Sequence, residues 1–359
     1  MKKPSKILII IQRSNGDVFL SLSLINKLKV VYKNAQIDLL INNDTLEVAK
    51  LLPNINSIYT FSYLKKQTNQ FKQEKNLLFT LFKKYDLSIN LTASDRSVIY
   101  ALLFGRNSIS AIESDNKKSW WKRWLLTYYY YFDKSKHILL NNLQPLNLLG
   151  IEHKNLQVAI DYEEPKTLRI KKILNNNNIS NFFIFHPSAQ YDYKVYPKHL
   201  RDKLLQLLNT LEIPIIVTGS NSTIDLRIKQ EIPTLPNIYN FIGETSLLEY
   251  FVLSDLALGY IGMDTLNMHI AASQNKRIFA IFGPTNLAMW SPWSNELETS
   301  SKINKPLQTY GSNTIFQADM SCVACGKAGC NDNHGKSECL YSISPAIIFN
   351  EIEGWFRNV

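Results

Sequence analysis

Short apolar runs alternate with helix-like stretches along the first half of the chain. Residues 6–11 form a β-branched apolar run, which predicts a fully buried parallel strand. Leucines and isoleucines then recur at helical spacing over residues 20–28, and a second strand-like run spans residues 36–41. A further run at residues 87–91 follows a lysine-rich helix over residues 77–84. This strand–helix–strand order predicts right-handed crossovers and a parallel sheet.

A second series of the same kind begins after a shift in composition over residues 161–180. The alternation of strands and short helices predicts a second doubly wound α/β domain. The expected strands are residues 182–185, 213–218, 255–260 and 277–282, and the expected helices are residues 200–211, 247–254 and 267–273.

The chain is therefore predicted to be an α/β protein of two Rossmann-like, doubly wound domains that face each other across a cleft. The predicted domains are residues 1–165 and residues 166–344, the second with a cysteine-rich loop at residues 319–340. Residues 345–359 hold a last amphipathic helix, over residues 345–356, which we expect to cross back onto the first domain. Open parallel sheets bind ligands beyond the carboxyl ends of their strands, so we expect the chemistry in the loops after strands.

Composition excludes several classes of protein. The chain has 359 residues, of which 45% are hydrophobic and 19% are charged, so disorder, collagen and coiled coil are excluded. No stretch reaches the roughly 18 apolar residues of a spanning helix. The first four residues lead into a strand rather than a signal peptide, so we expect a cytoplasmic protein.

The charge of the chain is concentrated in its first half. The formal net charge is +10, and residues 1–165 hold 23 Lys and Arg against 14 Asp and Glu. Residues 166–359 hold 17 against 16, which is nearly balanced. An anionic partner, such as a membrane surface or a phosphorylated ligand, is therefore expected to dock on the first half. Nucleic acid is disfavoured, because no motif of a nucleic-acid reader accompanies the charge.

The loop after the first strand, residues 13–17, has a single glycine. It matches neither the dinucleotide-binding fingerprint nor the phosphate-binding P-loop. Gly16 permits a tight turn. Asp17 opens the next helix, either as its N-cap or as a functional carboxylate.

Two loops of the second half carry groups that suit phosphate. Ser188 and Lys194 come after the first strand of that half, where a hydroxyl, backbone amides and a cation suit a diphosphate; an ordinary solvated loop is the alternative. Asp264 and Thr265 stand at a helix start, with His269 one turn later on the same face. There the alternative is a capped helix with a buried histidine. The chain contains no Asp-x-Asp pair, so a diphosphate-chelating metal site of that type has no candidate ligands.

Taken together, these motifs resemble the family 9 glycosyltransferases, the ADP-heptose:lipopolysaccharide heptosyltransferases of Gram-negative bacteria. The resemblance runs from Lys6 to about Trp293 and keeps the family's order and spacing. It implies the GT-B fold, a nucleotide-sugar in the C-terminal domain, a lipid acceptor in the N-terminal domain, and inversion without a catalytic metal or other cofactor. The motifs that carry it are Gly16-Asp17, Ser188 to Lys194 with Pro197, Asp264-Thr265 with His269, and residues 282–285.

The resemblance also implies roles for individual residues. Asp17 becomes the general base that takes a proton from the acceptor hydroxyl. Leu266 and Tyr196 depart from the family, which usually has glycine and tryptophan there; these departures concern the donor sugar more than the reaction type. The residues expected at the donor are Ser188, Lys194, Gly262, Met263, Asp264, Thr265, Leu266 and His269, and those expected at the acceptor are Arg13, Lys122 and Arg123.

Residues 117–136 mix lysines and arginine with tryptophans and tyrosines. Such a stretch is typical of a membrane interface, where aromatic rings lie at headgroup depth and cations contact phosphates. It also suits an oligonucleotide, or an amphipathic core helix with a solvated basic face. The membrane is our preferred interpretation.

The four cysteines lie within 18 residues, in the pattern C-x2-C-x4-C-x8-C. Because a cytosolic chain rarely keeps disulfides, this density predicts a structural zinc site, with free cysteines as the alternative. The expected ligands are Cys322, Cys325, Cys330 and either Cys339 or His334.

The sequence therefore predicts a heptosyltransferase of lipopolysaccharide biosynthesis. We expect it to move heptose from ADP-heptose to the Kdo-lipid A inner core, as a peripheral protein on the cytoplasmic face of the inner membrane. One alternative is transfer of another nucleotide-sugar to a similar lipid-linked acceptor. The other is a nucleotide-binding protein that docks on membranes without catalysis.

Overall fold

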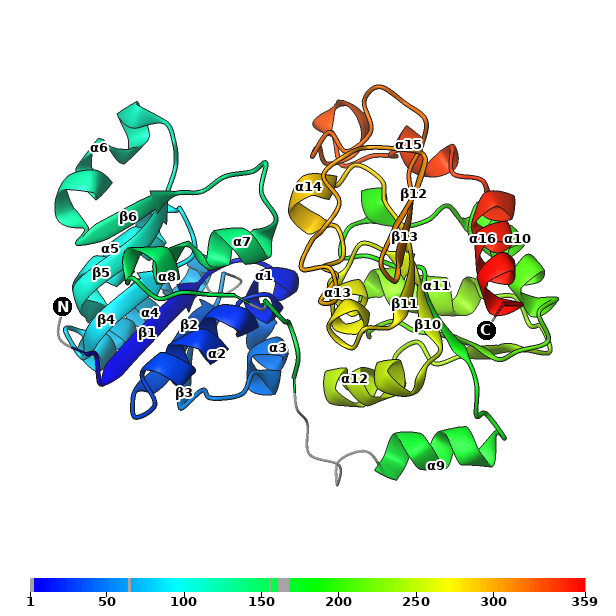
Figure 1. The fold of residues 1–359 in the computed structure, drawn as a ribbon, viewed down its shortest axis with the longest axis horizontal. Coiled ribbons are helices and arrows are strands. Elements are labelled where there is room, and N and C mark those ends of the chain that lie inside the picture. Colours follow the sequence, from blue (N-terminus) through cyan, green and yellow to red (C-terminus); the bar gives the residue numbers. More distant parts are fainter. Residues whose placement is uncertain (1–2, 64–65, 155, 161–167, 359) are drawn as a thin grey trace. The chain divides into compact units, whose positions relative to one another are not determined.

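The computed structural model describes residues 3–63, 66–154, 156–160 and 168–358. The chain forms two compact units, Met1–Asp161 and Tyr162–Val359. The domain boundary predicted at residue 165 lies outside the described residues. Each unit is a twisted sheet with helices on both faces (Figure 1), as expected for doubly wound α/β domains. The predicted cleft concerns the arrangement of the two units and stays a prediction.

The first unit holds a six-stranded, all-parallel sheet in the order β3-β2-β1-β4-β5-β6. Its central strands are almost entirely buried, which explains their continuous apolar sequences. The strands are β1 (Lys6–Ile11), β2 (Gln36–Asn42), β3 (Ser57–Phe61), β4 (Tyr85–Asn90), β5 (Gly105–Ile112) and β6 (Tyr128–Tyr131). The α-helices are α1 (Asn15–Phe19), α2 (Leu22–Val31), α3 (Leu46–Leu51), α4 (Lys66–Leu81), α5 (Asp95–Phe104), α6 (Asn116–Leu125), α7 (Ile138–Asn142) and α8 (Gln144–Leu148).

The second unit holds a seven-stranded sheet in the order β12-β13-β11-β10-β7-β8-β9. All neighbouring pairs are parallel except β12 and β13. The strands are β7 (Phe183–His186), β8 (Ile215–Val217), β9 (Ile238–Asn240), β10 (Gly259–Met263), β11 (Arg277–Ile281), β12 (Leu307–Tyr310) and β13 (Asn313–Phe316). The α-helices are α9 (Leu168–Asn176), α10 (Lys198–Asn209), α11 (Thr223–Glu231), α12 (Leu247–Leu256), α13 (Leu266–Ser273), α14 (Leu287–Trp290), α15 (Glu338–Tyr341) and α16 (Pro345–Phe356).

Both sheets reverse their strand order beside the first strand of the unit. The reversal falls between β1 and β4 in the first unit and between β7 and β10 in the second. Ligands of doubly wound sheets bind at the carboxyl ends of the strands at such a switch point. The segments directly after β1, β7 and β10 carry Arg13, Asp17, Ser188, Lys194, Asp264 and Thr265, so the topology places these residues where this fold binds ligands. Lys122 and Arg123 lie apart from them, on α6.

One predicted boundary in the second unit is wrong. Residues 255–260 were expected to be a strand, but α12 continues to Leu256 and β10 begins at Gly259. A capping box between Ser246 and Glu249 starts this helix, and Asp255 and Leu256 complete its last turn. The shift moves the end of β10 to Met263, directly before the Asp264-Thr265 motif.

The last helix, α16, buries its apolar face within the second unit. Ile348 and Ile352 are fully buried in the core of that unit. Trp355 lies edge-on to the rings of Phe183 in β7 and Phe279 in β11. The core of its own unit therefore covers this face. The expectation that α16 crosses back onto the first domain concerns the arrangement of the two units and stays a prediction. In the described part of the chain, no helix combines the length and apolarity that a membrane crossing needs.

Candidate active site

The site of the second unit begins where β10 approaches β7. Gly262 pairs with His186 and has a φ of +153°, a conformation that side chains disfavour. A Cβ atom at this position would lie 2.3 Å from the His186 carbonyl oxygen. Only glycine therefore allows the two strands to end this close together. The predicted donor residue Gly262 has this structural role.

His186 is a buried residue of this site that the sequence analysis did not assign. Its Nδ1 lies 3.1 Å from the Thr218 hydroxyl and 3.0 Å from the Asn267 amide nitrogen, and its Nε2 lies 3.4 Å from the Ser188 hydroxyl. Burial lowers the pKa of His186 to about 4, so the ring is neutral at pH 7, although the Asp225 charge opposes this shift. The ring therefore links the loops after β7 and β8 to the start of α13 without adding charge. The sequence could have indicated His186 as a site residue, because it stands at the end of a predicted strand, directly before Pro187.

Helix α13 begins at the end of β10 without a side-chain cap. Thr265 occupies the N-cap position, but its hydroxyl caps no backbone amide and lies 3.4 Å from the Tyr260 hydroxyl. The Tyr260 hydroxyl donates a hydrogen bond of 2.7 Å to the Met263 carbonyl, which fixes the turn. The alternative in which Thr265 only caps the helix is therefore not supported. Uncapped amides at a helix start favour an anion.

A small pocket lies beside this helix start and contains both expected charges of the donor site. Lys194 and Asp264 line it together with Met263, Gly283 and Thr285. Burial raises the pKa of the Asp264 carboxyl above its ordinary value. The nearby Lys194 ammonium and a hydrogen bond with Thr285 offset part of that rise. The structure thus brings Lys194 and Asp264 together, and adds Thr285, which the sequence analysis did not assign to the site.

The remaining donor candidates lie around the same strand ends. Ser188 and Met263 are buried, and Leu266 is half-buried at the start of α13. His269 is buried one turn further along, with its ring 6.1 Å from that of Trp290. All eight predicted donor residues lie at the carboxyl end of β10, in the segments that follow β7 and β10, or in α13.

The site of the first unit is built around a buried carboxylate. Asp17 is 2% exposed and accepts hydrogen bonds from the Ser14 amide, at 3.2 Å, and the Ser14 hydroxyl, at 2.6 Å. Ser14 is the N-cap of α1, and Asp17 is the N3 acid of the same capping box. The alternative in which Asp17 is itself the N-cap is therefore wrong, although its carboxylate does help to cap the helix. Burial raises the pKa of Asp17 above its ordinary value, against the opposing effects of Arg13 and Ser14. A buried carboxyl with a raised pKa in a ligand-binding loop is a candidate general base.

Arg13 holds Asp17 from the side of the loop. Its Nε lies 2.7 Å from the Asp17 carboxylate, and its guanidinium lies 4.6 Å from the centre of the Phe132 ring. The Arg13 carbonyl accepts a hydrogen bond from Asn42 at the end of β2. The guanidinium remains partly exposed, so its predicted contact with an anionic acceptor stays a prediction.

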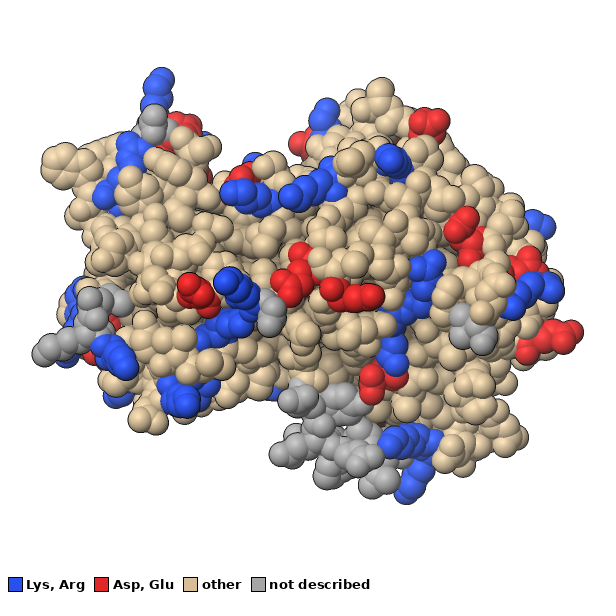
Figure 2. Space-filling view, in the orientation of Figure 1, with Lys and Arg blue, Asp and Glu red and all other residues tan. Residues whose placement is uncertain are grey.

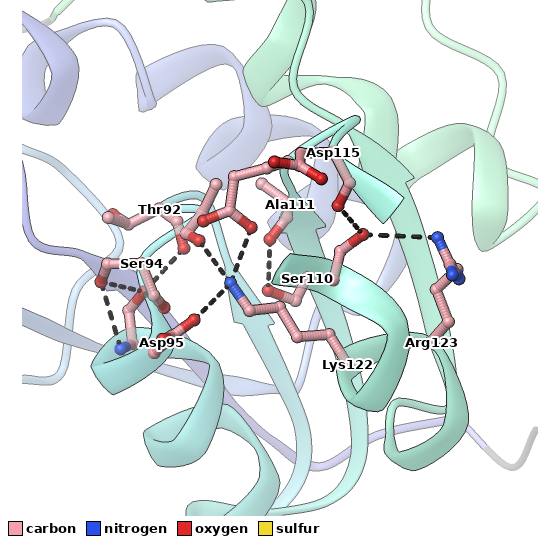
Figure 3. Close-up of polar contacts among 12 residues, drawn as sticks. Thr92, Ser94, Asp95, Ser110, Ala111, Asp115, Lys122 and Arg123 are labelled. Atoms are coloured by element: carbon pink, nitrogen blue, oxygen red, sulfur yellow. Dashed lines mark hydrogen bonds and ion pairs between the residues drawn. The ribbon is translucent and has the colours of Figure 1, made fainter. Parts of the chain in front are cut away.

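The sequence analysis expected Lys122 to bind the acceptor, but the structure shows that this residue is not exposed. Its side chain is fully buried, and its ammonium lies 2.7 Å from both the Asp95 and the Glu113 carboxylates (Figure 3). It also donates to the Ala93 carbonyl at 3.0 Å. Two carboxylates therefore neutralise this cation, and it ties α6 to α5 and to the end of β5. Arg123 is half-buried, with a guanidinium nitrogen 3.3 Å from the Ser119 hydroxyl (Figure 3), and its predicted role stays a prediction.

The four cysteines of the expected zinc site are free thiols, three in the segment between β13 and α15 and Cys339 in α15. Cys322 and Cys325 are exposed, Cys330 is half-buried and Cys339 is buried. The Glu338 amide donates to the Cys330 sulfur at 3.4 Å. Among the described residues, no three His, Cys, Asp or Glu side chains form a group that could hold a metal ion.

The family model "glycosyltransferase family 9 (heptosyltransferase)" matches residues 77–318, which is more than half of the chain. The protein is therefore a glycosyltransferase. It belongs to family 9, the heptosyltransferases of lipopolysaccharide biosynthesis.

Individual relatives agree with this assignment. The chain is 29% identical over 298 residues to lipopolysaccharide heptosyltransferase 3 of Escherichia coli (strain K12), covering 79% of this chain and 84% of that protein. Its fold is similar to E. coli ADP-heptose lipopolysaccharide heptosyltransferase II, with a TM-score of 0.71, 18% identity and coverage of 97% and 98%. It is also similar to E. coli heptosyltransferase WaaC with ADP, with a TM-score of 0.70, 14% identity and coverage of 97% and 99%. At these identities the two solved structures support the fold alone.

The buried position of Lys122 predicts a structural role that can be measured. Lys122→Met keeps most of the side-chain volume but removes the charge that balances Asp95 and Glu113. We expect the free energy of unfolding to fall by about 1.5–3 kcal/mol, the usual effect of losing hydrogen bonds to charged groups. Lys118→Met, at an exposed position of the same helix, is the matched control and should change it by less than about 0.5 kcal/mol. Equal stability of the two variants in urea unfolding would contradict the structural role.

Proposed function

We propose that this heptosyltransferase uses ADP-heptose as donor, inverts the anomeric centre and requires no catalytic metal. We further propose the phosphorylated Kdo-lipid A inner core as acceptor, on the cytoplasmic face of the inner membrane. The observation that carries the proposal is the uncapped start of α13 beside Lys194 at the switch point of the second sheet. Two of its fold relatives are described with ADP or as ADP-heptose enzymes, which is consistent with that donor.

In this mechanism Asp17 acts on the acceptor. Its carboxylate takes the proton of an acceptor hydroxyl as that oxygen bonds to the anomeric carbon of the heptose. The same carbon loses its bond to the phosphate oxygen, so one bond forms and one breaks with inversion. The raised pKa of Asp17 supports this role, because a stronger base removes a hydroxyl proton more readily.

The departing ADP gains negative charge as the glycosidic phosphate bond breaks. Lys194 and the amides at the start of α13 are suited to stabilise that charge. The pKa of Asp264 is already raised by burial, and Lys194 opposes that rise. A phosphate that binds Lys194 would weaken this opposing effect and so favour the neutral form of Asp264. The cation and the helix amides would thereby do the work that a metal ion does in enzymes with an Asp-x-Asp pair.

We also propose that the four cysteines hold a structural zinc ion. The pKa of Cys339 is raised to about 11, first by burial and then by the nearby Cys325, Cys330 and Cys322 thiols. This mutual influence supports a common site. Since the described side chains are not assembled around a metal, zinc binding would have to displace the thiol protons and draw the loop together.

Asp17→Asn tests the base. We expect turnover to fall by roughly 10²–10⁴-fold, the usual contribution of a general base, while the affinity for ADP-heptose stays nearly unchanged. Steady-state kinetics with purified acceptor measure both quantities. Turnover close to wild type would remove Asp17 from the mechanism. Wild-type protein that binds ADP-heptose but shows no turnover would instead favour the non-catalytic nucleotide-binding alternative.

Asp17→Asn should lower turnover but should not lower the stability of the protein. Because the folded-state pKa of Asp17 is raised, the ionised carboxylate costs stability above that pKa, and this cost is absent once the group is protonated. Asp17→Asn should therefore melt no lower than wild type at pH 8, and any advantage should shrink as the pH falls. Asp86→Asn is the matched control: hydrogen bonds from Ser5 lower the pKa of Asp86, so this variant should lose stability at pH 8 and recover it relative to wild type at low pH.

Lys194→Ala tests the donor site. We expect kcat to fall by roughly 10²–10³-fold, the usual cost of one donor to developing charge, together with weaker ADP-heptose binding. Lys198→Ala, which removes a neighbouring lysine paired with Asp202, should leave both values near wild type. A normal kcat in Lys194→Ala would exclude this lysine from stabilising the leaving group.

The same assay checks whether the reaction needs a metal ion. Wild-type activity should survive excess EDTA, and loss of activity that magnesium restores would contradict the metal-free mechanism.

Metal analysis tests the zinc proposal. Protein purified without chelator should contain about one zinc ion per chain. Cys325→Ser should lower both the zinc content and the melting temperature, while the affinity for ADP-heptose stays unchanged. Zinc-free wild-type protein would show that the cysteines are free thiols.

A further inference from the structure

One helical layer of the first unit exposes an unusual number of large apolar side chains. Helices α4, α5 and α6 cover the same face of its sheet, because α5 shares one core cluster with α4 and another with the segment of α6 and β6. Outside this packing, Phe71 and Phe79 are 82% and 81% exposed and Trp124 is 87% exposed. The further exposed members are Phe82, Trp120 and Leu125. We call this surface the α4–α6 layer.

Three exposed phenylalanines lie in a stripe along one side of α4, two within the helix and one directly after it. Phe71, Phe79 and Phe82 succeed one another at spacings of about two turns and one turn, which places them on one side of the helix. Leu77 and Leu81, on the opposite side, are buried in the core. A helix at the surface of a soluble protein normally presents polar residues there. Its outer stripe is therefore suited to an apolar surface.

Cations accompany the aromatic rings on both outer helices. Lys72 and Lys75 are exposed on α4, and the Lys75 ammonium lies 5.7 Å from the centre of the Phe79 ring. Lys117 and Lys118 are exposed at the start of α6. In the space-filling view, blue cationic side chains stand over α6 beside uncharged surface (Figure 2). This combination excludes a purely apolar partner and favours one with negative charge at its rim.

We propose that the α4–α6 layer docks the enzyme on an anionic phospholipid bilayer. Aromatic rings partition to headgroup depth, and lysines beside them contact lipid phosphates. A second copy of this chain fits less well, because it would place the lysines of one layer against those of the other. The proposal rests on the proposed function in one respect, since a lipid-linked acceptor gives a reason for membrane contact.

The surface differs from the one that the sequence suggested. Lys122 is buried and paired, so it cannot contact lipid. The phenylalanine stripe of α4 contributes to the proposed lipid contact instead. The sequence analysis described this helix only as lysine-rich. The bilayer contact is thus assigned to rings on two helices, with lysines at their sides.

The test compares vesicle binding by two triple variants. Phe71→Ser/Phe79→Ser/Trp124→Ser removes three rings of the layer. The control, Leu297→Ser/Ile303→Ser/Ile347→Ser, removes three exposed apolar residues of the second unit. Each ring that enters the interface contributes roughly tenfold to partitioning, so the first variant should bind phosphatidylcholine–phosphatidylglycerol vesicles at least about 100-fold more weakly than wild type. The control should bind as wild type does.

Two further measurements separate folding and catalysis from docking. The layer variant should keep the wild-type melting temperature and the wild-type kcat on detergent-solubilised acceptor, which shows that it is folded. Brominated lipid should quench the tryptophan fluorescence of wild type, and Trp120→Phe/Trp124→Phe should lose that quenching.

Unchanged vesicle binding by the layer variant would overturn the proposal. So would a wild-type dimer that this variant converts to monomer while vesicle binding persists, because the layer would then be an interface between copies. Vesicle binding that depends on the layer, in a protein with no transferase activity, would support the docking surface and contradict the proposed function instead.

Discussion

The donor edge of the second unit depends on the close approach of β10 to β7. A Cβ at Gly262 would lie 2.3 Å from the His186 carbonyl oxygen, so any other residue would push the strands apart. Because the strands end together, the His186 ring reaches Asn267 at the start of α13, and Lys194 shares a pocket with Asp264. A backbone contact therefore sets the geometry of the proposed donor site, and the positions of its side chains follow from that contact.

The two units share an electrostatic arrangement at their switch points. Asp17 in one and Asp264 in the other have raised pKa values because burial outweighs a neighbouring cation, Arg13 or Lys194. An anionic ligand that binds such a cation takes away the partner of the carboxylate and should raise its pKa further. For Asp264 this favours the neutral form beside a diphosphate. For Asp17 an anionic acceptor at Arg13 would strengthen the base.

Continuous patterns made part of the fold predictable from the sequence, whereas features that depend on neighbours far along the chain were missed. The strands predicted at residues 6–11 and 277–282 were found, the second one residue shorter than predicted, because a buried parallel strand is apolar throughout. The loops predicted to bind the donor were chosen because they come directly after such strands, and the structure does place them after β7 and β10. Lys122 was misassigned because Asp95 and Glu113, which neutralise it, come from other elements. The burial of Ile348 and Ile352 of α16 in the core of the second unit was missed for the same reason, since an amphipathic pattern does not identify the surface that will cover it.

Not every cation of the first half is available to a partner. Lys122 is paired with Asp95 and Glu113, and Arg13 is paired with Asp17, whereas lysines such as Lys75 and Lys118 are exposed. Each of these ion pairs removes charge of both signs, so the net positive excess of this half remains. Each exposed lysine is worth about 1 kcal/mol near an anionic bilayer, and salt screens this attraction. The rings beside them contribute apolar transfer energy that salt does not screen. Salt therefore separates the two contributions to membrane binding, because it weakens the attraction of the lysines but not the insertion of the rings. A surface that combines both can bind a bilayer reversibly without a spanning helix.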